Sequence, residues 1–396
     1  MISFKEAYNI VLETALGFDD VLVPLSKADG RVLAEDVKAD RDFPPFDRAT
    51  KDGIAICLGN AFHEAYTIKG VAAAGTPQLD LEQDGDCYEI MTGAIVPRNA
   101  NAVVMYEHLE IEQGKAIINR PMAVGQNIHV KGSDEREGSV LLKKGRTITA
   151  AEIGVLASVG KTEVWVKKNP KITLFSTGDE LVAVGEVPKT HQIRQSNSHT
   201  LGAALLENGI ASDMIHVIDD ENAIKTALTT AMESSDVVLL SGGVSKGKFD
   251  FLPKVLDALG VQKQFHRVLQ RPGKPFWFGV HPNSSTTVFG FPGNPTSTFA
   301  NFHVYFMPWL NKGFGRHTVE FQVILKEDFE NTTDLTRFIR TAVVTLEGKL
   351  HAKLISGNGS GDLTSLTMAN GFIRVKPHQS IATNEKVIFI PTRRIL

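Results

Sequence analysis

The sequence predicts a multidomain protein of α/β and β structure, built around a central doubly wound α/β domain. Three apolar runs predict this domain, each followed by a glycine-containing loop and a helical pattern; they lie at 171–176, 236–240 and 286–290. Short apolar runs joined by helices form parallel sheets, which bind ligands where loops leave the carboxyl ends of the strands. The three loops therefore predict one composite site.

The residues before this repeat predict a helix, a β-rich region and a second helix. Residues 3–16 have amphipathic spacing, and Ser3 and Glu6 are placed as a capping box. Short β-like runs follow at 65–68, 87–90, 102–106 and 115–118. A second capped helix is predicted at 149–160, before a strand at 163–166.

The residues after the repeat predict a terminal β domain. Helical periodicity disappears after about Gly315, and five runs have strand patterns, at 319–325, 341–346, 349–355, 372–375 and 386–390. The turn at Glu347-Gly348 predicts a hairpin between two of these runs. Short strands of this kind favour a small β-barrel or sandwich.

Composition and charge exclude several classes of function. A chain of 396 residues is longer than one hydrophobic core usually supports, which favours several domains. No apolar run approaches the roughly 20 residues that span a bilayer, so membrane integration is not expected. The formal net charge of −3 provides no basic surface for a nucleic-acid backbone. Cys57 and Cys87 lack metal-ligand spacing, and the N-terminus lacks a signal-peptide pattern, so we expect a cytoplasmic location.

The first of the three loops, Thr177-Gly-Asp-Glu-Leu181, carries two adjacent carboxylates. The loop can be a simple turn in which Asp179 or Glu180 caps the next element. Alternatively, the carboxylates hold a hard divalent cation such as Mg²⁺ at the edge of the sheet. The candidates for a binding role in this loop are Thr177, Gly178, Asp179 and Glu180.

The second loop, at 241–250, has a more specific composition. Its glycines allow positive φ and close approach of the backbone, so several N–H groups can point at an anion, and its serines add hydroxyl donors. Its lysines can neutralise phosphate, although exposure to solvent is the commoner fate of a single lysine. The loop predicts a phosphate or pterin site made by Ser241, Gly242, Gly243 and Ser245, with Lys246 and Lys248 nearby.

Two proline-containing turns are further candidates. Arg271-Pro-Gly-Lys-Pro275 places two cations around a rigid turn, which suits phosphate, although a type II turn uses the same Pro-Gly pair. Pro292-Gly-Asn-Pro295 precedes a helical run at 296–310. Its amides and the helix N-terminus can face an anion, or the segment can be a stiff connector. The candidate residues here are Arg271, Lys274, Pro292, Asn294 and Pro295.

Other acidic and polar positions have simple interpretations when each is taken alone. Asp52-Gly53 and Met91-Thr-Gly-Ala94 can be turns, and Asp134 can be a surface carboxylate. Asp219-Asp220 can cap a helix at 221–234. The histidines have no zinc-hydrolase spacing, and the chain has neither a Gly-x-Ser-x-Gly elbow nor a Gly-Lys-Ser/Thr phosphate loop.

In this order, the motifs resemble the molybdopterin molybdenumtransferase family, which inserts molybdate into molybdopterin and includes the gephyrin E domain. The resemblance covers essentially the whole chain. Its carriers are Met91-Thr-Gly-Ala94, Gly125-Gln-Asn-Ile128 with Gly132 and Asp134, Ser176-Thr-Gly-Asp-Glu-Leu181, Asn197, Ser241-Gly-Gly-Val-Ser245 with Gly247 and Asp250, Arg271-Pro-Gly-Lys-Pro-Phe276 and Pro292-Gly-Asn-Pro295. One motif departs from the family, because Lys51-Asp52-Gly53-Ile54 stands where Met-Asp-Gly-Tyr is usual.

The resemblance implies four domains and a homodimer. The domains would be an elongated two-segment N-terminal domain, an inserted β-rich domain, an α/β molybdopterin-binding domain and a C-terminal β-barrel domain, at 1–40 with 135–168, 41–134, 169–312 and 313–396. The active cleft would lie between the α/β domain of one subunit and the inserted domain of the other. By the same resemblance, the acidic or polar cleft positions are Asp52, Thr92, Asp134, Glu180, Asp219 and Asp250.

The implied reaction converts adenylylated molybdopterin and molybdate into molybdenum cofactor and AMP. Both substrates are anions, so a metal and cationic side chains must offset their repulsion. We therefore expect Mg²⁺ at Glu180, Asp250 and Asp52. Phosphate or pterin would contact Ser241, Ser245, Lys274 and the glycine amides. Further candidates for the anions are Arg271, Arg337 and Arg340.

Two alternative functions remain open on the sequence. A molybdopterin adenylyltransferase has a similar α/β domain, but it would not need the flanking β domains. A non-catalytic dimeric scaffold of the gephyrin E-domain type would keep the fold in order to bind a partner peptide. The expected partners of a transferase also include molybdopterin adenylyltransferase and molybdoenzyme acceptors.

Overall fold

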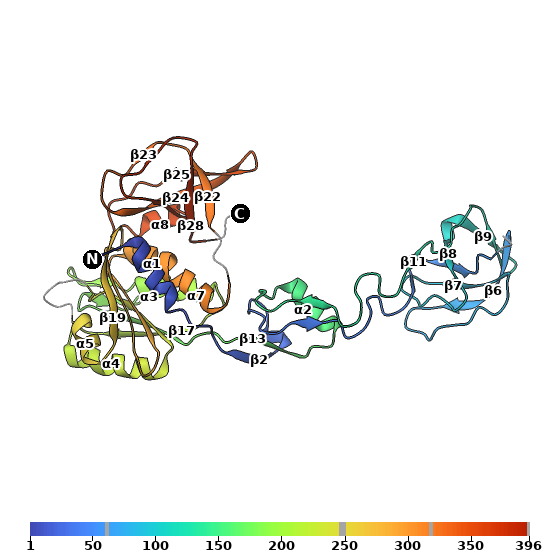
Figure 1. The fold of residues 1–396 in the computed structure, drawn as a ribbon, viewed down its shortest axis with the longest axis horizontal. Helices are drawn as coiled ribbons and strands as arrows, with labels where there is room; N and C mark the ends of the chain where they lie inside the picture. Colours follow the sequence, from blue (N-terminus) through green and yellow to red (C-terminus); the bar gives the residue numbers. More distant parts are fainter. Residues whose placement is uncertain (60–62, 245–250, 317–319, 394–396) are drawn as a thin grey trace. The chain divides into compact units, whose positions relative to one another are not determined.

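The computed structural model describes residues 1–59, 63–244, 251–316 and 320–393 (Figure 1). The chain forms two compact units. Unit 1 consists of Met1–Val21, Gly30–Val32 and Val166–Leu396, and unit 2 consists of Leu22–Asp29 and Leu33–Trp165. Residues 1–21 thus pack with the α/β part of the chain, and the grouping of 1–40 with 135–168 stays a prediction.

Unit 1 contains the parallel sheet that the three apolar runs predict. Its strands are β14 (Ile172–Thr177), β17 (Ser212–Val217), β18 (Val237–Ser241) and β21 (Thr287–Phe291), paired in parallel in the order β17-β14-β18-β21. The connecting helices are α3 (Asn197–Leu206), α4 (Glu221–Ser234) and α5 (Leu252–Ala258). The predicted helix at 221–234 is confirmed, and the Asp220 side chain caps it by accepting from the Ala223 N–H at 2.9 Å.

Alternate side chains of these strands enter two different hydrophobic cores. Leu174 and Leu239 pack with α3 and with the helical segment that follows β21. Phe175 and Leu240 pack with α4 and α5, which lie side by side in Figure 1. Because a parallel sheet is stable when helices cover both of its faces, this arrangement confirms the doubly wound α/β fold.

An antiparallel extension joins the parallel strands to the rest of unit 1. β20 (Pro275–Val280) pairs with β21, and β19 (Gln262–Arg271) pairs with β20, both antiparallel. β1 (Ile2–Ser3) lies parallel to β19. At its far end β19 pairs in parallel with β24 (Thr336–Leu346), which brings Arg271 into register with Arg337.

The C-terminal strands close into a barrel-like sheet. β24 pairs with β25 (Lys349–Leu354), β25 with β22 (Phe321–Leu325), β22 with β28 (Lys386–Pro391), and β28 with β26 (Gly371–Val375). β26 then pairs back with β24 and completes the ring. The predicted hairpin at Glu347-Gly348 is confirmed as the β24–β25 turn. The smaller elements of this part are β23 (Phe329–Glu330), β27 (Ser380–Ile381) and α8 (Thr364–Met368).

Two helical segments cover the same face of the sheet. The predicted run at 296–310 forms α6 (Pro295–Asn301), a π-helical turn η3 (Phe302–Phe306) and α7 (Met307–Gly313). The N-terminal helix α1 (Phe4–Glu13) begins with the predicted capping box, in which the Ser3 and Glu6 side chains accept from each other's N–H groups. The remaining strands of unit 1 are β15 (Leu181–Val182) and β16 (Ile193–Arg194).

Unit 2 contains a six-stranded sheet in the order β8-β5-β7-β6-β10-β9. Its strands are β5 (Gly53–Ile56), β6 (Ala65–Ala72), β7 (Asp86–Ile90), β8 (Ala102–Met105), β9 (Leu109–Glu112) and β10 (Lys115–Ile118). Four of these strands confirm the predicted β-like runs.

The remaining described elements of unit 2 are one helix and several short segments. The helix is α2 (Ala150–Ser158), which has its predicted capping box. The short segments are β3 (Val37–Lys38), β4 (Arg48–Ala49), β11 (Ile128–His129), β12 (Val140–Leu142), η1 (Leu25–Lys27) and η2 (Tyr106–His108).

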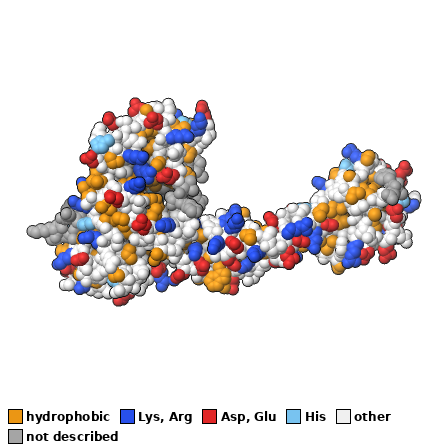
Figure 2. Space-filling view, viewed as in Figure 1, with side chains coloured by type: hydrophobic (Ala, Val, Ile, Leu, Met, Phe, Trp, Pro, Cys, Tyr) orange, Lys and Arg blue, Asp and Glu red, His pale blue; other side chains and the backbone are white. Residues whose placement is uncertain are grey.

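One two-stranded ladder pairs β2 (Asp20–Pro24) with β13 (Glu163–Lys167). Within the described ranges, no helix is long and apolar enough to cross a bilayer. On the face drawn in Figure 2, basic and acidic side chains are interspersed over both units.

Candidate functional site

The three predicted loops line one pocket in unit 1, which we call the loop pocket. Its volume is about 550 Å³, and it lies where β14, β18 and β21 end. Its lining includes Thr177, Gly178, Glu180, Asp219, Ser241, Gly242, Gly243, Pro292, Asn294 and Pro295. The parallel pairing brings these loops together, because parallel strands end at the same edge of the sheet.

Asn197, the first residue of α3, connects two of these loops. Its side-chain Nδ2 donates to Ser241 Oγ and to the Gly293 carbonyl, both at 2.8 Å. Ser241 is the last residue of β18 and Gly293 follows β21, so one amide group holds the two loops at a fixed separation. The sequence identified Asn197 only as part of the family resemblance, because its partners are distant along the chain.

The glycines of the second loop are required by close packing against the first. Gly242 and Gly243 have φ of +95° and +60°, and a Cβ on either would lie within 3 Å of Thr177 atoms. The Gly242 N–H donates to the Phe291 carbonyl at 3.2 Å. The expectation that both glycine amides face an anion is therefore wrong for Gly242, whose amide is part of the protein's own hydrogen bonding.

The carboxylates of the first loop have different environments. Glu180 is exposed, and its side chain has no hydrogen bond or ion pair within the described part of the chain. Asp219 accepts a hydrogen bond from the Thr177 hydroxyl. Asp179 accepts from the Asp219 N–H at 3.0 Å and does not line the loop pocket, so it braces the loop. Glu180 is thus the free carboxylate of this loop.

Three N–H groups at the start of α6 have hydrogen-bond partners within the protein. The Thr296 N–H donates to the Ser360 carbonyl, and the Ser297 and Thr298 N–H groups donate to the Asn294 carbonyl. Of the two alternatives that the sequence left open for this segment, these hydrogen bonds favour the stiff connector. Pro292, Asn294 and Pro295 still line the pocket, and Asn294 Nδ2 donates to Ser360 Oγ at 2.9 Å.

A second pocket of about 550 Å³ adjoins the loop pocket, and we call it the cation pocket. The two pockets share three lining residues, Pro275, Pro292 and Asn294. The cation pocket is lined by Arg271, Lys274, Arg337 and Arg340, which the sequence named separately as anion candidates, and by no Asp or Glu. The structure brings these four cations together.

Arg271, Lys274 and Arg337 have no carboxylate partner within the described residues, whereas hydrogen bonds and, to a smaller extent, the charge of Arg340 lower the pKa of Asp362. None of the four forms an ion pair within the residues that the structure describes. Burial lowers the pKa of Arg337 from its ordinary value, and the charge of Arg271 lowers it further. Arg337 Nε is buried without a hydrogen-bond partner in the described structure. Buried donors are normally satisfied, so this guanidinium is suited to an anionic ligand.

Two predicted site residues of unit 2, from different segments of the chain, are joined by a hydrogen bond. The Thr92 N–H donates to Asp52 Oδ1 at 2.6 Å, and this bond lowers the pKa of Asp52 below its usual value. Both residues are exposed. Asp52 therefore carries a charge at neutral pH and also holds the Met91–Gly93 loop.

Asp134 of unit 2 has a partner that sequence reasoning missed. His129 Nε2 lies 2.8 Å from Asp134 Oδ1, and a guanidinium nitrogen of Arg48 lies 3.1 Å from His129 Nδ1. Because a guanidinium only donates, His129 Nδ1 accepts and Nε2 donates to the carboxylate. Arg48 and His129 are register partners in β4 and β11. Sequence reasoning could not find this contact, because β4 and β11 have only two residues each and show no strand pattern in the sequence.

The metal prediction falls partly outside the described residues. Asp250, Ser245, Lys246 and Lys248 belong to the range 245–250, which the structure does not describe. Across the remaining described ranges, no three His, Cys, Asp or Glu side chains are grouped so that they could hold a metal ion. The Mg²⁺ assignment thus stays a prediction.

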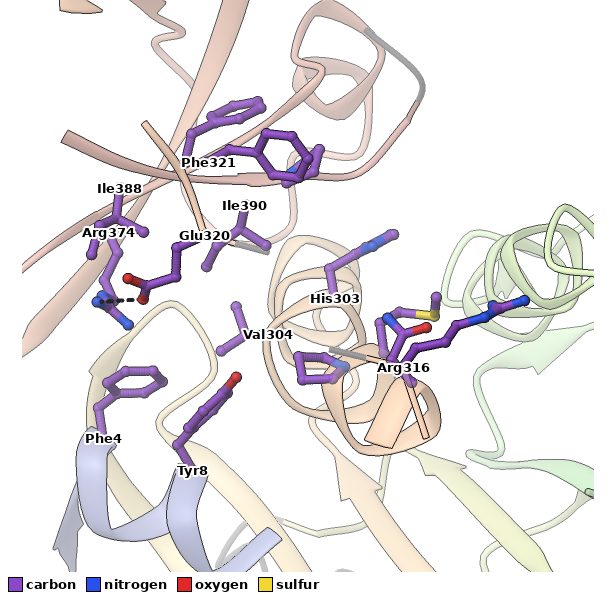
Figure 3. A pocket seen from close by; sticks show the side chains of 15 residues that line it. Phe4, Tyr8, His303, Val304, Arg316, Glu320, Phe321, Arg374, Ile388 and Ile390 are labelled. Carbon is purple, nitrogen blue, oxygen red and sulfur yellow. Dashed lines mark hydrogen bonds and ion pairs between the residues drawn. The ribbon is translucent and has the colours of Figure 1, made fainter. Parts of the chain in front are cut away.

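A third pocket in unit 1, of about 380 Å³, contains none of the predicted site residues. Figure 3 shows Phe4 and Tyr8 of α1 on one side of it, with Val304 between them and the C-terminal strands. At its edge, Arg374 and Glu320 form an ion pair at 3.4 Å. Its largely apolar lining separates it chemically from the loop and cation pockets.

The chain matches known proteins over nearly its full length. Residues 2–160 match "MoeA N-terminal region (domain I and II)", 173–312 match "Probable molybdopterin binding domain", and 322–392 match "MoeA C-terminal region (domain IV)". A molybdopterin molybdenumtransferase of Synechocystis is 37% identical over 96% of this chain and 97% of its own length. The Bacillus subtilis protein of the same name is 34% identical, over 87% of this chain and 83% of its own length.

Solved structures agree with these matches. The crystal structure of a molybdopterin biosynthesis moeA protein from Pyrococcus horikoshii is similar with a TM-score of 0.84 and 31% identity, and the similarity covers 100% of both chains. The fold, the order of the motifs and the full-length relatives thus agree. The chain belongs to the molybdopterin molybdenumtransferase (MoeA) family.

Proposed function

We propose that the protein inserts molybdate into adenylylated molybdopterin and releases AMP, forming molybdenum cofactor. The observation that carries this proposal is the adjacency of two unlike pockets, one polar and one cationic, which share Pro275, Pro292 and Asn294. The matches to the N-terminal and C-terminal MoeA regions favour this reaction over that of an adenylyltransferase built from the α/β domain alone.

Electrostatics explains why such a reaction needs the cation pocket. Two unit charges of the same sign, 5 Å apart, repel by about 3 kcal/mol at an effective dielectric constant of about 20. Molybdate carries two negative charges and the nucleotide carries phosphates, so their approach is costly without cations. Arg271, Lys274 and Arg337 have no carboxylate partner in the described structure and are therefore suited to bind the oxyanion.

The loop pocket is suited to the pterin nucleotide. Its volume of about 550 Å³ lies within the range of roughly 300–1,000 Å³ that is typical of small-molecule sites. Ser241 supplies a hydroxyl donor, because its Oγ accepts from Asn197, and the Gly243 N–H has no protein partner within the described residues. These groups can bind phosphate or the edge of a pterin without adding negative charge.

We propose that Glu180 provides a carboxylate ligand for a bound Mg²⁺. Mg²⁺ usually takes one or two carboxylates and completes its shell with water and substrate phosphate. The free carboxylate of Glu180 at the loop pocket meets this requirement, and by the family resemblance the further ligands are Asp250, which lies outside the described residues, and Asp52 from the inserted domain of the second subunit. When bound, the cation would supply positive charge to the phosphates.

AMP is the product that distinguishes this reaction from the alternatives. Adding molybdate to the protein with adenylylated molybdopterin should release AMP in proportion to molybdenum cofactor formed, as measured by chromatography. An adenylyltransferase would instead consume ATP, and a scaffold of the gephyrin E-domain type would release nothing. Absence of molybdate-dependent AMP release would contradict the proposal.

Glu180 should be required for turnover and not for folding. Glu180→Ala and Asp250→Ala should each lower Mg²⁺-dependent AMP release by about 100-fold or more, the usual cost of removing a transition-state charge contact. The melting temperature of Glu180→Ala should be unchanged, because this side chain is exposed and makes no hydrogen bond or ion pair within the described residues. Glu186→Ala, which removes a neighbouring exposed carboxylate, is the matched control and should be active. Near-normal turnover in the Glu180 and Asp250 variants would refute the assignment.

Asp52 should act through its charge as well as through the Thr92 bond. Asp52→Ala should lower AMP release by at least roughly tenfold, about 1.4 kcal/mol of barrier. Asp52→Asn keeps an oxygen that accepts from the Thr92 N–H, so an equal loss in this variant assigns the effect to charge. Lys51→Ala should change the rate by less than about threefold, as expected of an exposed lysine. A larger loss from Lys51→Ala than from Asp52→Ala would point to an anion site instead.

We also propose that the protein is a cytoplasmic homodimer. The proposal rests on the family resemblance and on two cysteines that form no disulfide, Cys57 and Cys87. Light scattering at micromolar concentration should give twice the chain mass of 43.2 kDa. A fully active monomer would contradict it. Molybdopterin adenylyltransferase and molybdoenzymes are the proposed partners that supply the substrate and accept the product.

A further inference from the structure

A fully buried polar network adjoins the cation pocket, whose lining includes one of its members, Gln270. Tyr305 of η3, Gln270 of β19 and Asn301 of α6 have no exposed surface. The Tyr305 hydroxyl is hydrogen-bonded to Gln270 Oε1, and Gln270 Nε2 donates to Asn301 Oδ1 at 2.7 Å. Gln270 directly precedes Arg271, so the network adjoins the turn that carries two of the pocket's cations.

The hydrogen-bond directions in this network are fixed. Gln270 Nε2 faces only acceptors, which are the Pro272 and Gly273 carbonyls, both at 3.2 Å, and Asn301 Oδ1. The amide oxygen of Gln270 must therefore face Tyr305, whose hydroxyl donates. Asn301 Nδ2 donates to the Gly273 carbonyl at 3.4 Å. Such fully satisfied buried networks specify one arrangement of the chain.

The network determines which groups of the turn face the interior. Two turn carbonyls, those of Pro272 and Gly273, bind Gln270, whose side chain is completely buried. These partially negative oxygens are thereby kept on the interior side. The side chains of Arg271 and Lys274 line the cation pocket. Gly273 packs so closely on the network that a Cβ there would lie 2.2 Å from Asn301 Oδ1.

We propose that Tyr305, Gln270 and Asn301 are positioning residues that set the oxyanion affinity of the cation pocket. They hold the 271–274 turn so that its cations face the ligand and its carbonyls do not. The inference rests on the proposed function of the pocket, and it assigns no contact between these three residues and a substrate. A network that only stabilised the fold would leave oxyanion affinity unchanged in variants that remain folded.

Tyr305→Phe is the most direct test, because it removes one hydroxyl and keeps the ring that packs on Phe276. Calorimetry with molybdate alone should show a Kd about tenfold higher than in the unchanged protein, the size expected when a buried acceptor loses its donor. AMP binding, and kcat at saturating molybdate, should change by less than twofold, so that the loss appears in KM for molybdate. Gln270→Met removes the donor to both turn carbonyls and should raise the Kd for molybdate to a similar extent. This variant replaces Tyr305→Phe as the test if Tyr305→Phe does not fold.

Two control variants make the test decisive. Tyr8→Phe removes the hydroxyl of a ring 6.4 Å from Tyr305 that is outside the network, and its molybdate Kd should stay within twofold. Arg337→Ala removes a cation of the pocket itself and should weaken molybdate binding at least tenfold. If Arg337→Ala weakens binding while Tyr305→Phe and Gln270→Met do not, the positioning inference is overturned and the pocket's function stands. If Arg337→Ala binds molybdate normally, the proposed function of the pocket fails, and the inference fails with it.

Discussion

The parallel pairing of β14, β18 and β21 is the constraint on which the site depends. Because these strands run in the same direction, their carboxyl ends meet at one edge, where the loops after Thr177, Ser241 and Phe291 enclose the loop pocket. Asn197 then fixes the spacing of two loops through a single amide group. A catalytic scaffold of this kind places polar groups precisely, since rigid strands support loops that have few internal contacts.

The second constraint is electrostatic and arises where β19 meets β24. That parallel pairing puts Arg271 beside Arg337, a costly arrangement that burial of Arg337 makes worse. Unbalanced charge of this sort persists when function requires it, because a ligand of opposite sign compensates for it. The buried network around Gln270 supports the same turn from the interior, so charge on one side and hydrogen bonds on the other define a single geometry.

Sequence patterns predicted the features that depend on local chemistry. The capping boxes at Ser3 and Thr149 and the helix at 221–234 are confirmed, because caps and periodicity act within a few residues. The meeting of the three loops at one site was also predicted, because parallel strands end at the same edge of a sheet. The Gly242 amide was predicted wrongly, since its partner, the Phe291 carbonyl, comes from a segment that no local pattern connects to it.

Long-range pairing accounts for most of what the sequence did not predict. Arg271, Arg337 and Arg340 were named as separate anion candidates, but only the β19–β24 contact makes them one pocket. His129 gained a role from its register with Arg48, in strands too short to recognise. The Tyr305–Gln270 bond joins residues 35 positions apart, and both would be read from the sequence as ordinary core or surface residues.

The central claim is that the cation pocket binds the tetrahedral oxyanion next to the pterin nucleotide. Anomalous diffraction from crystals grown with tungstate, a heavier tetrahedral oxyanion, tests this claim most directly. We expect a tungsten peak within hydrogen-bonding reach of Arg271, Lys274 or Arg337. A fully occupied tungsten position elsewhere, with none beside these three residues, would contradict it.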